Sequence, residues 1–102
     1  MMISRNEPSR RLVLDLEMFS SADLPRGGVK KYTEAPDFEI LLMSYAWDGG
    51  PVQLWDFTQS GPPDWLVPAL LDPAITKIAW NVSFERNCLN AALGIYTPPE
   101  QW

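Results

Sequence analysis

The segment RLVLDLE, residues 11–17, constrains the fold most, because it joins the apolar pattern of a buried strand to two carboxylates. Side chains alternate between the two faces of a strand, so the three leucines of this segment share one face. Val13, Asp15 and Glu17 share the other face, which puts the two acids about 7 Å apart along it. Such a pair is stable when a cation bridges it or when both groups reach water. The segment therefore predicts either a metal site or a solvated strand end.

Composition excludes several kinds of site. The 102 residues suffice for one domain, and they include no histidine, which removes Ser/His and Cys/His nucleophilic schemes built within this chain. Cys88 is the one cysteine, so an internal disulfide is excluded and a reducing compartment is favoured. The net charge of −5 argues against nucleic-acid binding by charge alone. It leaves open an acidic site that meets phosphates through divalent cations.

The first half of the chain predicts strands and a long loop. We expect residues 1–10 to form a flexible arm and residues 11–17 a strand. Residues 18–39 lack clear periodicity and carry several Pro and Gly, which indicates a loop of a length that is usually functional or mobile. Residues 40–47 and 51–55 are apolar and aromatic, and Asp48-Gly49-Gly50 between them supplies turn chemistry, so they predict a hairpin.

The second half predicts helix, strand and helix. In residues 60–72 a short helix is expected, with Asp64 as its cap and Pro68 tolerated in its first turn. Residues 75–80 predict a strand, and residues 83–94 a helix that Ser83 caps and Gly94 ends. This order indicates an α/β fold whose mixed sheet has an antiparallel hairpin and then a parallel crossover.

A second acidic motif lies where the last strand meets the last helix. In AWNVSFERNCL, Asn81 precedes the helix and Glu85 falls in its first turn. An acid in a first turn complements the helix dipole, and an Asn at that point can cap, so a purely structural role is open for both.

Together, LVLDLEMFSS and AWNVSFERNCLN resemble the first and second motifs of the 3′–5′ exonucleases with four metal-binding acids, the DEDD group of the ribonuclease-H-like fold. The resemblance extends over residues 11–102 and is strongest to the N-terminal proofreading-type exonuclease domain of phage and prophage family A DNA polymerases. It implies metal-dependent hydrolysis of the terminal phosphodiester of DNA, with Mg²⁺ or Mn²⁺ in a two-metal site.

The resemblance also implies roles for individual residues. Asp15, Glu17 and Glu85 match the catalytic, metal-binding acids, and Asn81 matches the frame of the second motif, at a substrate-binding position. Met18 stands beside the position of the terminal nucleotide, where relatives usually carry threonine, and Trp80 stands where close relatives often have histidine. In the long loop, basic and aromatic side chains suit a phosphate backbone and a base, although a solvated basic patch explains them equally well: Arg26, Lys30, Lys31 and Tyr32.

The family's third motif, with the fourth acid, matches nothing in this chain, so the expected fold is incomplete at its C-terminus. We therefore expect a truncated exonuclease domain acting on a single-stranded 3′ end of DNA, in the cytoplasm of a bacterial host cell and without a membrane partner. The alternatives are an inactive remnant and a small protein-interaction module that uses the five Trp. An incomplete sheet would leave an unpaired edge, through which the chain could self-associate.

Overall fold

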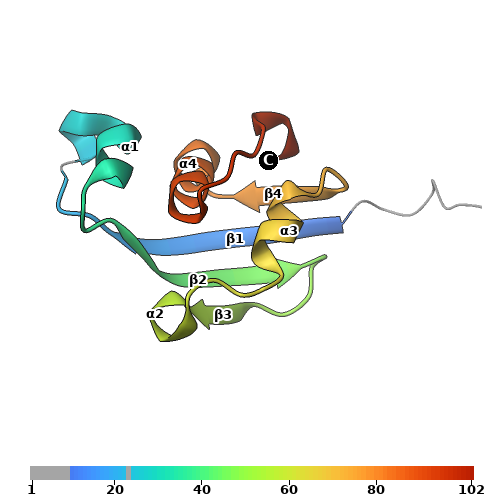
Figure 1. Ribbon diagram of the computed structural model, residues 1–102. Helices are drawn as coiled ribbons and strands as arrows, with labels where there is room; N and C mark the ends of the chain where they lie inside the picture. Colours follow the sequence, from blue (N-terminus) through green and yellow to red (C-terminus); the bar gives the residue numbers. More distant parts are fainter. Residues whose placement is uncertain (1–9, 23) are drawn as a thin grey trace, which may run out of the picture.

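The fold of residues 10–22 and 24–102, which the computed structural model describes, is one mixed sheet with helices on one of its faces (Figure 1). In sheet order β3-β2-β1-β4, the strands are β3 Gln53–Asp56, β2 Glu39–Trp47, β1 Arg10–Phe19 and β4 Ile75–Ala79. The helices are α1 Leu24–Glu34, α2 Phe57–Ser60, α3 Leu66–Leu71, α4 Val82–Leu93 and the 3-10 helix η2 Pro99–Gln101.

The pairing of β1 defines the topology. β1 runs antiparallel to β2, from Leu12 opposite Trp47 to Phe19 opposite Glu39, and parallel to β4 as far as Leu14 opposite Ala79. β3 completes the antiparallel hairpin with β2, and the chain then crosses through α2 and α3 to reach β4. This mixed α/β sheet confirms the predicted fold class and is consistent with a ribonuclease-H-like arrangement.

The turn of the hairpin forms where the sequence predicts it. Asp48 and Gly49 both have positive φ, 51° and 79°, a pattern that Asp-Gly pairs adopt readily in tight hairpins. The carboxylate of Asp48 also accepts hydrogen bonds from the backbone N–H of Arg11 at 2.7 Å and from Nε of Arg10 at 3.0 Å. These contacts fix the turn against the start of β1.

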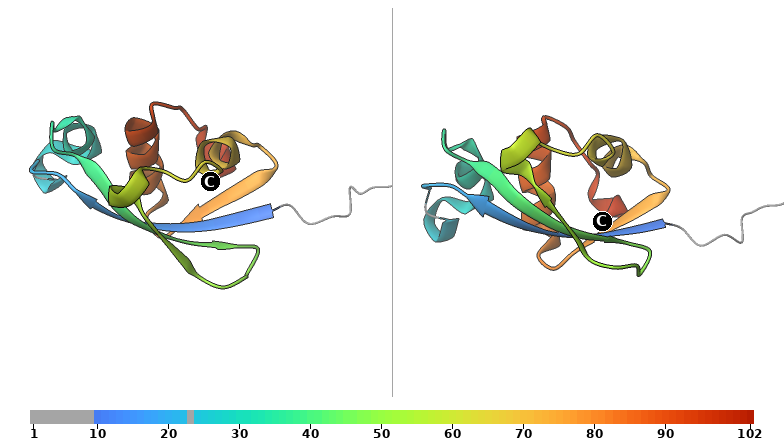
Figure 2. Two further views of the ribbon diagram at one scale, coloured as in Figure 1. Left: turned by 60° about the horizontal axis from the view of Figure 1, so that its bottom comes forward. Right: turned by 90° about the horizontal axis from the view of Figure 1, so that it is seen from below.

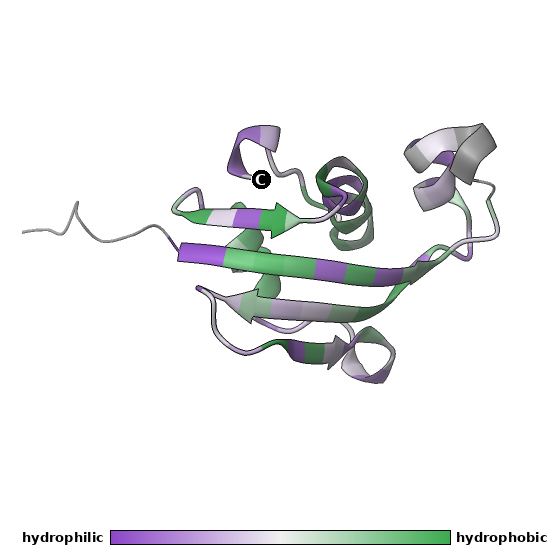
Figure 3. Cartoon of the chain, turned by 180° about the vertical axis from the view of Figure 1, so that it is seen from behind, coloured by the Kyte–Doolittle hydropathy of each residue, from purple (hydrophilic) through white to green (hydrophobic). Residues whose placement is uncertain are grey.

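The hydrophobic core lies between the sheet and the helices. The leucines at positions 12, 14 and 16 of β1 are buried as the alternation predicts, and Val13 between them is 41% exposed. Their partners in the core come from β2, α3 and α4: Met43, Tyr45, Leu66, Leu70 and Leu89. The view from behind shows the apolar central part of β1 giving way to polar bands toward its end (Figure 3).

The long loop expected over residues 18–39 is wrong in its main part. β1 continues to Phe19, and α1 occupies Leu24–Glu34 as two helical pieces that join at Gly28, which has φ 71° and ψ −179°. The Gly and Pro residues of this segment favour a loop, but packing against α4 stabilises a helix there. The centroid of the Tyr32 ring lies 5.5 Å from that of the Phe84 ring in α4.

Both predicted N-caps are also wrong. α3 begins at Leu66 behind Trp65, so Asp64 is not its cap. α4 begins at Val82, which makes Asn81 its N-cap residue and puts Ser83 inside the helix. Both helices end as predicted, at Asp72 and at the left-handed Gly94.

Some predictions fall outside the described residues, namely the flexible arm, except that Arg10 already belongs to β1, and the role of the Arg26 side chain. Among the strands that the structure describes, β3 and β4 each pair on one side only, and self-association through such an edge stays a prediction. No helix within residues 10–22 and 24–102 has the length and apolarity needed to cross a membrane.

Candidate active site

The buried carboxyl group of Glu85 is the centre of the candidate site. α4 starts directly after the short turn that follows β4, and Glu85 lies in its first turn, 4% exposed. Because β4 stops pairing with β1 at Leu14, the backbone of β1 beyond that point has no strand partner on this side. Oε1 of Glu85 fills that place by accepting the N–H of Leu16 at 3.0 Å.

The second oxygen of this carboxyl group lacks a protein partner. Oε2 of Glu85 is buried and accepts no hydrogen bond from the residues that the structure describes. Burial is the main reason why the pKa of Glu85 is raised; the hydrogen bond from the N–H of Leu16 lowers this pKa, and the carboxyl of Asp15 raises it further. A buried acid with one open oxygen is satisfied by a proton or by a cation.

Asp15 brings a second carboxyl group to the same place. It is exposed on β1 directly before Leu16, whose N–H binds Glu85, and it contributes to the raised pKa of Glu85. Two carboxyls that share a site repel when both are ionised, and a divalent cation removes that repulsion. The donor set therefore fits a hard cation such as Mg²⁺ or Mn²⁺.

Glu17 does not complete a three-acid cluster in this structure. Its side chain is exposed, one alternation beyond Asp15 on β1. Within residues 10–22 and 24–102, no three Asp, Glu, Cys or His side chains are arranged to hold one metal ion. The pairing of β1 with β2 shifts register directly after Glu17, where a β-bulge skips Leu41. Irregularities of this kind re-aim neighbouring side chains.

The two residues matched to the substrate-binding positions nearest the acids differ in burial. Met18 follows Glu17 on β1 and is half-buried against the core. Asn81 is exposed at the start of α4, and its side chain makes no capping hydrogen bond. The amide of Asn81 therefore faces solvent at the end of the helix that carries Glu85.

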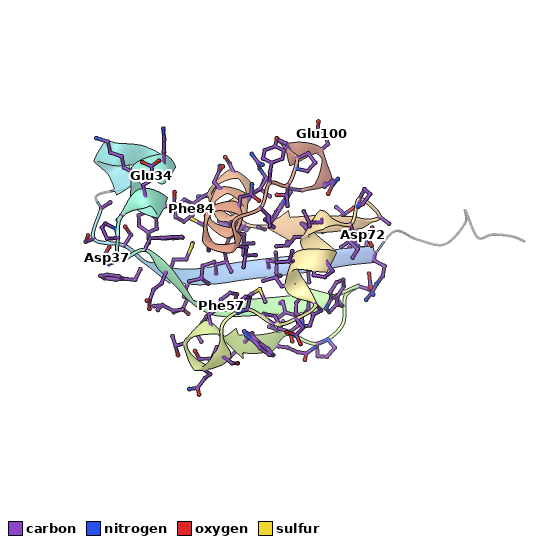
Figure 4. All side chains as sticks on the ribbon, in the orientation of Figure 1. Glu34, Asp37, Phe57, Asp72, Phe84 and Glu100 are labelled. Atoms are coloured by element: carbon purple, nitrogen blue, oxygen red, sulfur yellow. The ribbon has the colours of Figure 1, made fainter. Side chains whose placement is uncertain are left out.

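The three matched residues of α1 also differ. Lys30 and Lys31 are exposed, and Nζ of Lys30 lies 4.0 Å from the carboxylate of Glu34. Tyr32 is half-buried, with its ring centroid 5.8 Å from that of Phe38 and 5.5 Å from that of Phe84. Figure 4 shows Phe84 on the side of α4 that faces α1. Tyr32 thus packs α1 against the residue that precedes Glu85.

Sequence reasoning missed two features of this site. One is the N–H of Leu16, since a backbone donor leaves no mark in a side-chain pattern. The other is the exposure of Trp80, which is 98%. The sequence carried a signal for the second, because Trp80 directly precedes the motif that contains Asn81 and Glu85.

Comparisons with known proteins point to a polymerase. No protein-family model and no solved structure matches this chain. Over 94 residues, 91% of this chain, it is 44% identical to the DNA polymerase of Bacillus phage SP02. The match spans 14% of that polymerase. The chain is therefore related to one region of a phage DNA polymerase.

Proposed function

We propose that this chain is part of a 3′–5′ exonuclease domain of a phage-type DNA polymerase, which hydrolyses the terminal phosphodiester of a single-stranded DNA end. The observation that carries the proposal is the buried carboxyl of Glu85, which binds the N–H of Leu16, the residue after Asp15, and whose Oε2 has no partner among the described residues. The similarity to a region of a phage DNA polymerase agrees with this reaction class.

Under this proposal Asp15 and Glu85 hold Mg²⁺ or Mn²⁺, and Glu17 joins them when the ion and the substrate are bound. A divalent ion at such a site lowers the pKa of a bound water and stabilises charge on the leaving oxygen. The N–H of Leu16 fixes Oε1 of Glu85, so that Oε2 is the oxygen left for a ligand.

The rest of the site would position DNA. Asn81 and Met18 lie next to the acids along α4 and β1 and would contact the terminal nucleotide. Lys30 and Lys31 would meet backbone phosphates from α1. Tyr32 is already used in packing against Phe84, so its contribution would be to hold α1 in place.

We expect this chain alone to hydrolyse DNA slowly, because the fourth acid of the family has no match in it and three acids bind metal more weakly than four. If the remaining acids hold no metal ion at all, the chain is an inactive remnant of such a domain. The other candidate function, a protein-interaction module, is favoured by a separate observation: the helix-free face of the sheet exposes apolar side chains, among them Val13, Val52, Leu54 and Ile78.

The test is a 3′-labelled single strand incubated with Mg²⁺ or Mn²⁺ and the wild-type chain, Asp15→Ala or Glu100→Ala. Glu100 is an exposed acid on η2, outside β1 and α4, and serves as the matched control. We expect metal-dependent shortening from the 3′ end with the wild type and with Glu100→Ala, and a loss of about a hundredfold or more with Asp15→Ala.

Shortening that persists in Asp15→Ala would assign the nuclease activity to another site or to a contaminant and contradict the proposal. A wild-type chain that binds neither metal nor DNA would favour the interaction module. A 3′-labelled RNA strand of the same sequence, tested in the same assay, shows whether the site accepts a 2′-hydroxyl.

A further inference from the structure

Trp80 is the most exposed large hydrophobic residue in the part of the chain that the structure describes, at 98%. Tryptophan is highly buried on average, because its large ring gains more free energy than most side chains when it is removed from water. The side chain of Trp80 is almost fully exposed, and it lies in the short turn between β4 and α4. An aromatic ring held there without packing is available to a ligand.

Trp80 and Asp15 each directly follow the last paired residues of two neighbouring strands. β1 and β4 pair as far as Leu14 opposite Ala79, so Asp15 and Trp80 are each one residue beyond that last pair. Neighbouring strands are about 4.8 Å apart. A phosphodiester held at Asp15 would therefore have its attached base within reach of the Trp80 ring.

The exposed face of the sheet just before Trp80 is apolar. Ile78 of β4 pairs with Val13 of β1, and the two side chains are about two-fifths exposed, at 39% and 41%. Figure 2 shows this face of the sheet without helices. A shallow hollow of about 160 Å³ opens on it, lined among others by Val13, Asp15 and Val52. This face therefore has an exposed apolar surface next to the carboxylate of Asp15.

We propose that Trp80 is a stacking platform for a nucleobase of single-stranded DNA, and that it holds the nucleotide whose phosphodiester lies at Asp15 and Glu85. The nature of this ligand rests on the proposed function. The chain has a net charge of −5, so its affinity for a polyanion cannot come from charge alone. Stacking on an aromatic ring supplies affinity that is independent of charge and tolerant of sequence, because every base has a π-face.

The experiment measures the binding of a 5′-fluorescein-labelled oligothymidylate by fluorescence anisotropy in Mg²⁺, with probe integrity checked on a gel. The variants are Trp80→Ala, Trp80→Phe and Tyr96→Ala. Tyr96 is a matched control, since it is an exposed aromatic (68%) outside the β4–α4 turn. A second probe carries an abasic residue at its 3′ end. Circular dichroism verifies that each variant is folded.

We expect Trp80→Ala to raise the Kd about tenfold or more, Trp80→Phe to restore most of the affinity, and Tyr96→Ala to have no effect. For the abasic probe, Trp80→Ala and the wild type should bind equally, because the stacking partner is missing. Three results would each overturn the proposal: no binding by the wild type, an equal loss with both probes, or no difference between Trp80→Ala and Tyr96→Ala.

The design separates this proposal from the proposed function. Trp80-dependent binding by a chain that fails the nuclease assay would leave the stacking site standing and remove the exonuclease. Hydrolysis that depends on Asp15 but has the same KM in Trp80→Ala as in the wild type would support the exonuclease and remove the stacking site. Loss of self-association in Trp80→Ala, with DNA binding unchanged, would reassign the ring to a contact between proteins.

Discussion

The two carboxyl oxygens of Glu85 differ in their hydrogen bonding. One oxygen accepts the N–H of Leu16, and the other is buried without a hydrogen-bond partner among the residues that the structure describes. The raised pKa of Glu85 means that the folded chain holds this proton more tightly than the unfolded chain does. Stability from this group is therefore complete below the ordinary pKa of 4.5 and is lost as the pH rises through the raised value.

Replacing Glu85 by Gln should remove this loss, because the amide oxygen can still accept the N–H of Leu16 and cannot ionise. In EDTA, the free energy of unfolding of the wild type should fall relative to that of Glu85→Gln as the pH rises from 5 to 8. Urea denaturation at both pH values measures this difference.

The control is Glu100→Gln, which replaces an exposed acid on η2. Its free energy of unfolding should change with pH as that of the wild type does. Mg²⁺ should stabilise the wild type at pH 8 and leave Glu85→Gln unchanged. A wild type that gains stability over Glu85→Gln as the pH rises would contradict the assigned cause.

At the level of elements, α4 is held at both ends. Its first turn is fixed to β1 through Glu85, and its last turn is followed by a segment that folds back on it. Thr97 in that segment is fully buried; its hydroxyl donates to Oδ1 of Asn90 at 2.9 Å and accepts from Nε1 of Trp102 at 3.1 Å. The C-terminal segment thus keeps α4 in the position from which Glu85 reaches β1.

Thr97→Val keeps the shape of the side chain and removes both hydrogen bonds, which leaves two polar partners unsatisfied in a partly buried place. We expect a loss of about 1–3 kcal/mol in the free energy of unfolding, measured by urea denaturation. Thr76→Val, on the exposed face of β4, is the matched control and should stay within about 0.5 kcal/mol of the wild type. Equal effects of the two substitutions would show that the hydroxyl of Thr97 has no such role.

The elements that the sequence predicted are those with a local signal. The hairpin has Asp48-Gly49 at its turn, and α4 has an apolar stripe and a stop at Gly94. α1 has no such signal, because Pro25, Gly27 and Gly28 lower its intrinsic helix propensity. It forms through contacts between residues distant in the sequence, such as that of Tyr32 with Phe84.

Across the whole molecule, the helices and the core lie on one face of the sheet (Figure 2). Asp15 and Val13 of β1 are exposed on the other face, and Trp80 is exposed in the turn after β4. The sequence marked Asp15 and Glu85 as candidates, and only the resemblance to exonucleases predicted that they share a pocket. Their contact depends on β4, with five residues, ending before the ten-residue β1 does. That difference is tertiary and leaves no local pattern. The same motif made Glu17 a candidate, but within residues 10–22 and 24–102 it belongs to no three-acid cluster.

The central claim is that Asp15 and Glu85 together bind a divalent cation at the end of β1. Its most direct test is a titration with substoichiometric Mn²⁺, followed by paramagnetic broadening of backbone amide resonances in the wild type, Asp15→Asn, Glu85→Gln and Glu100→Gln. We predict that broadening centres on Leu16 and the first turn of α4, disappears in Asp15→Asn and in Glu85→Gln, and persists in Glu100→Gln. Broadening that is centred elsewhere, or that survives both substitutions in the acid pair, would contradict the claim.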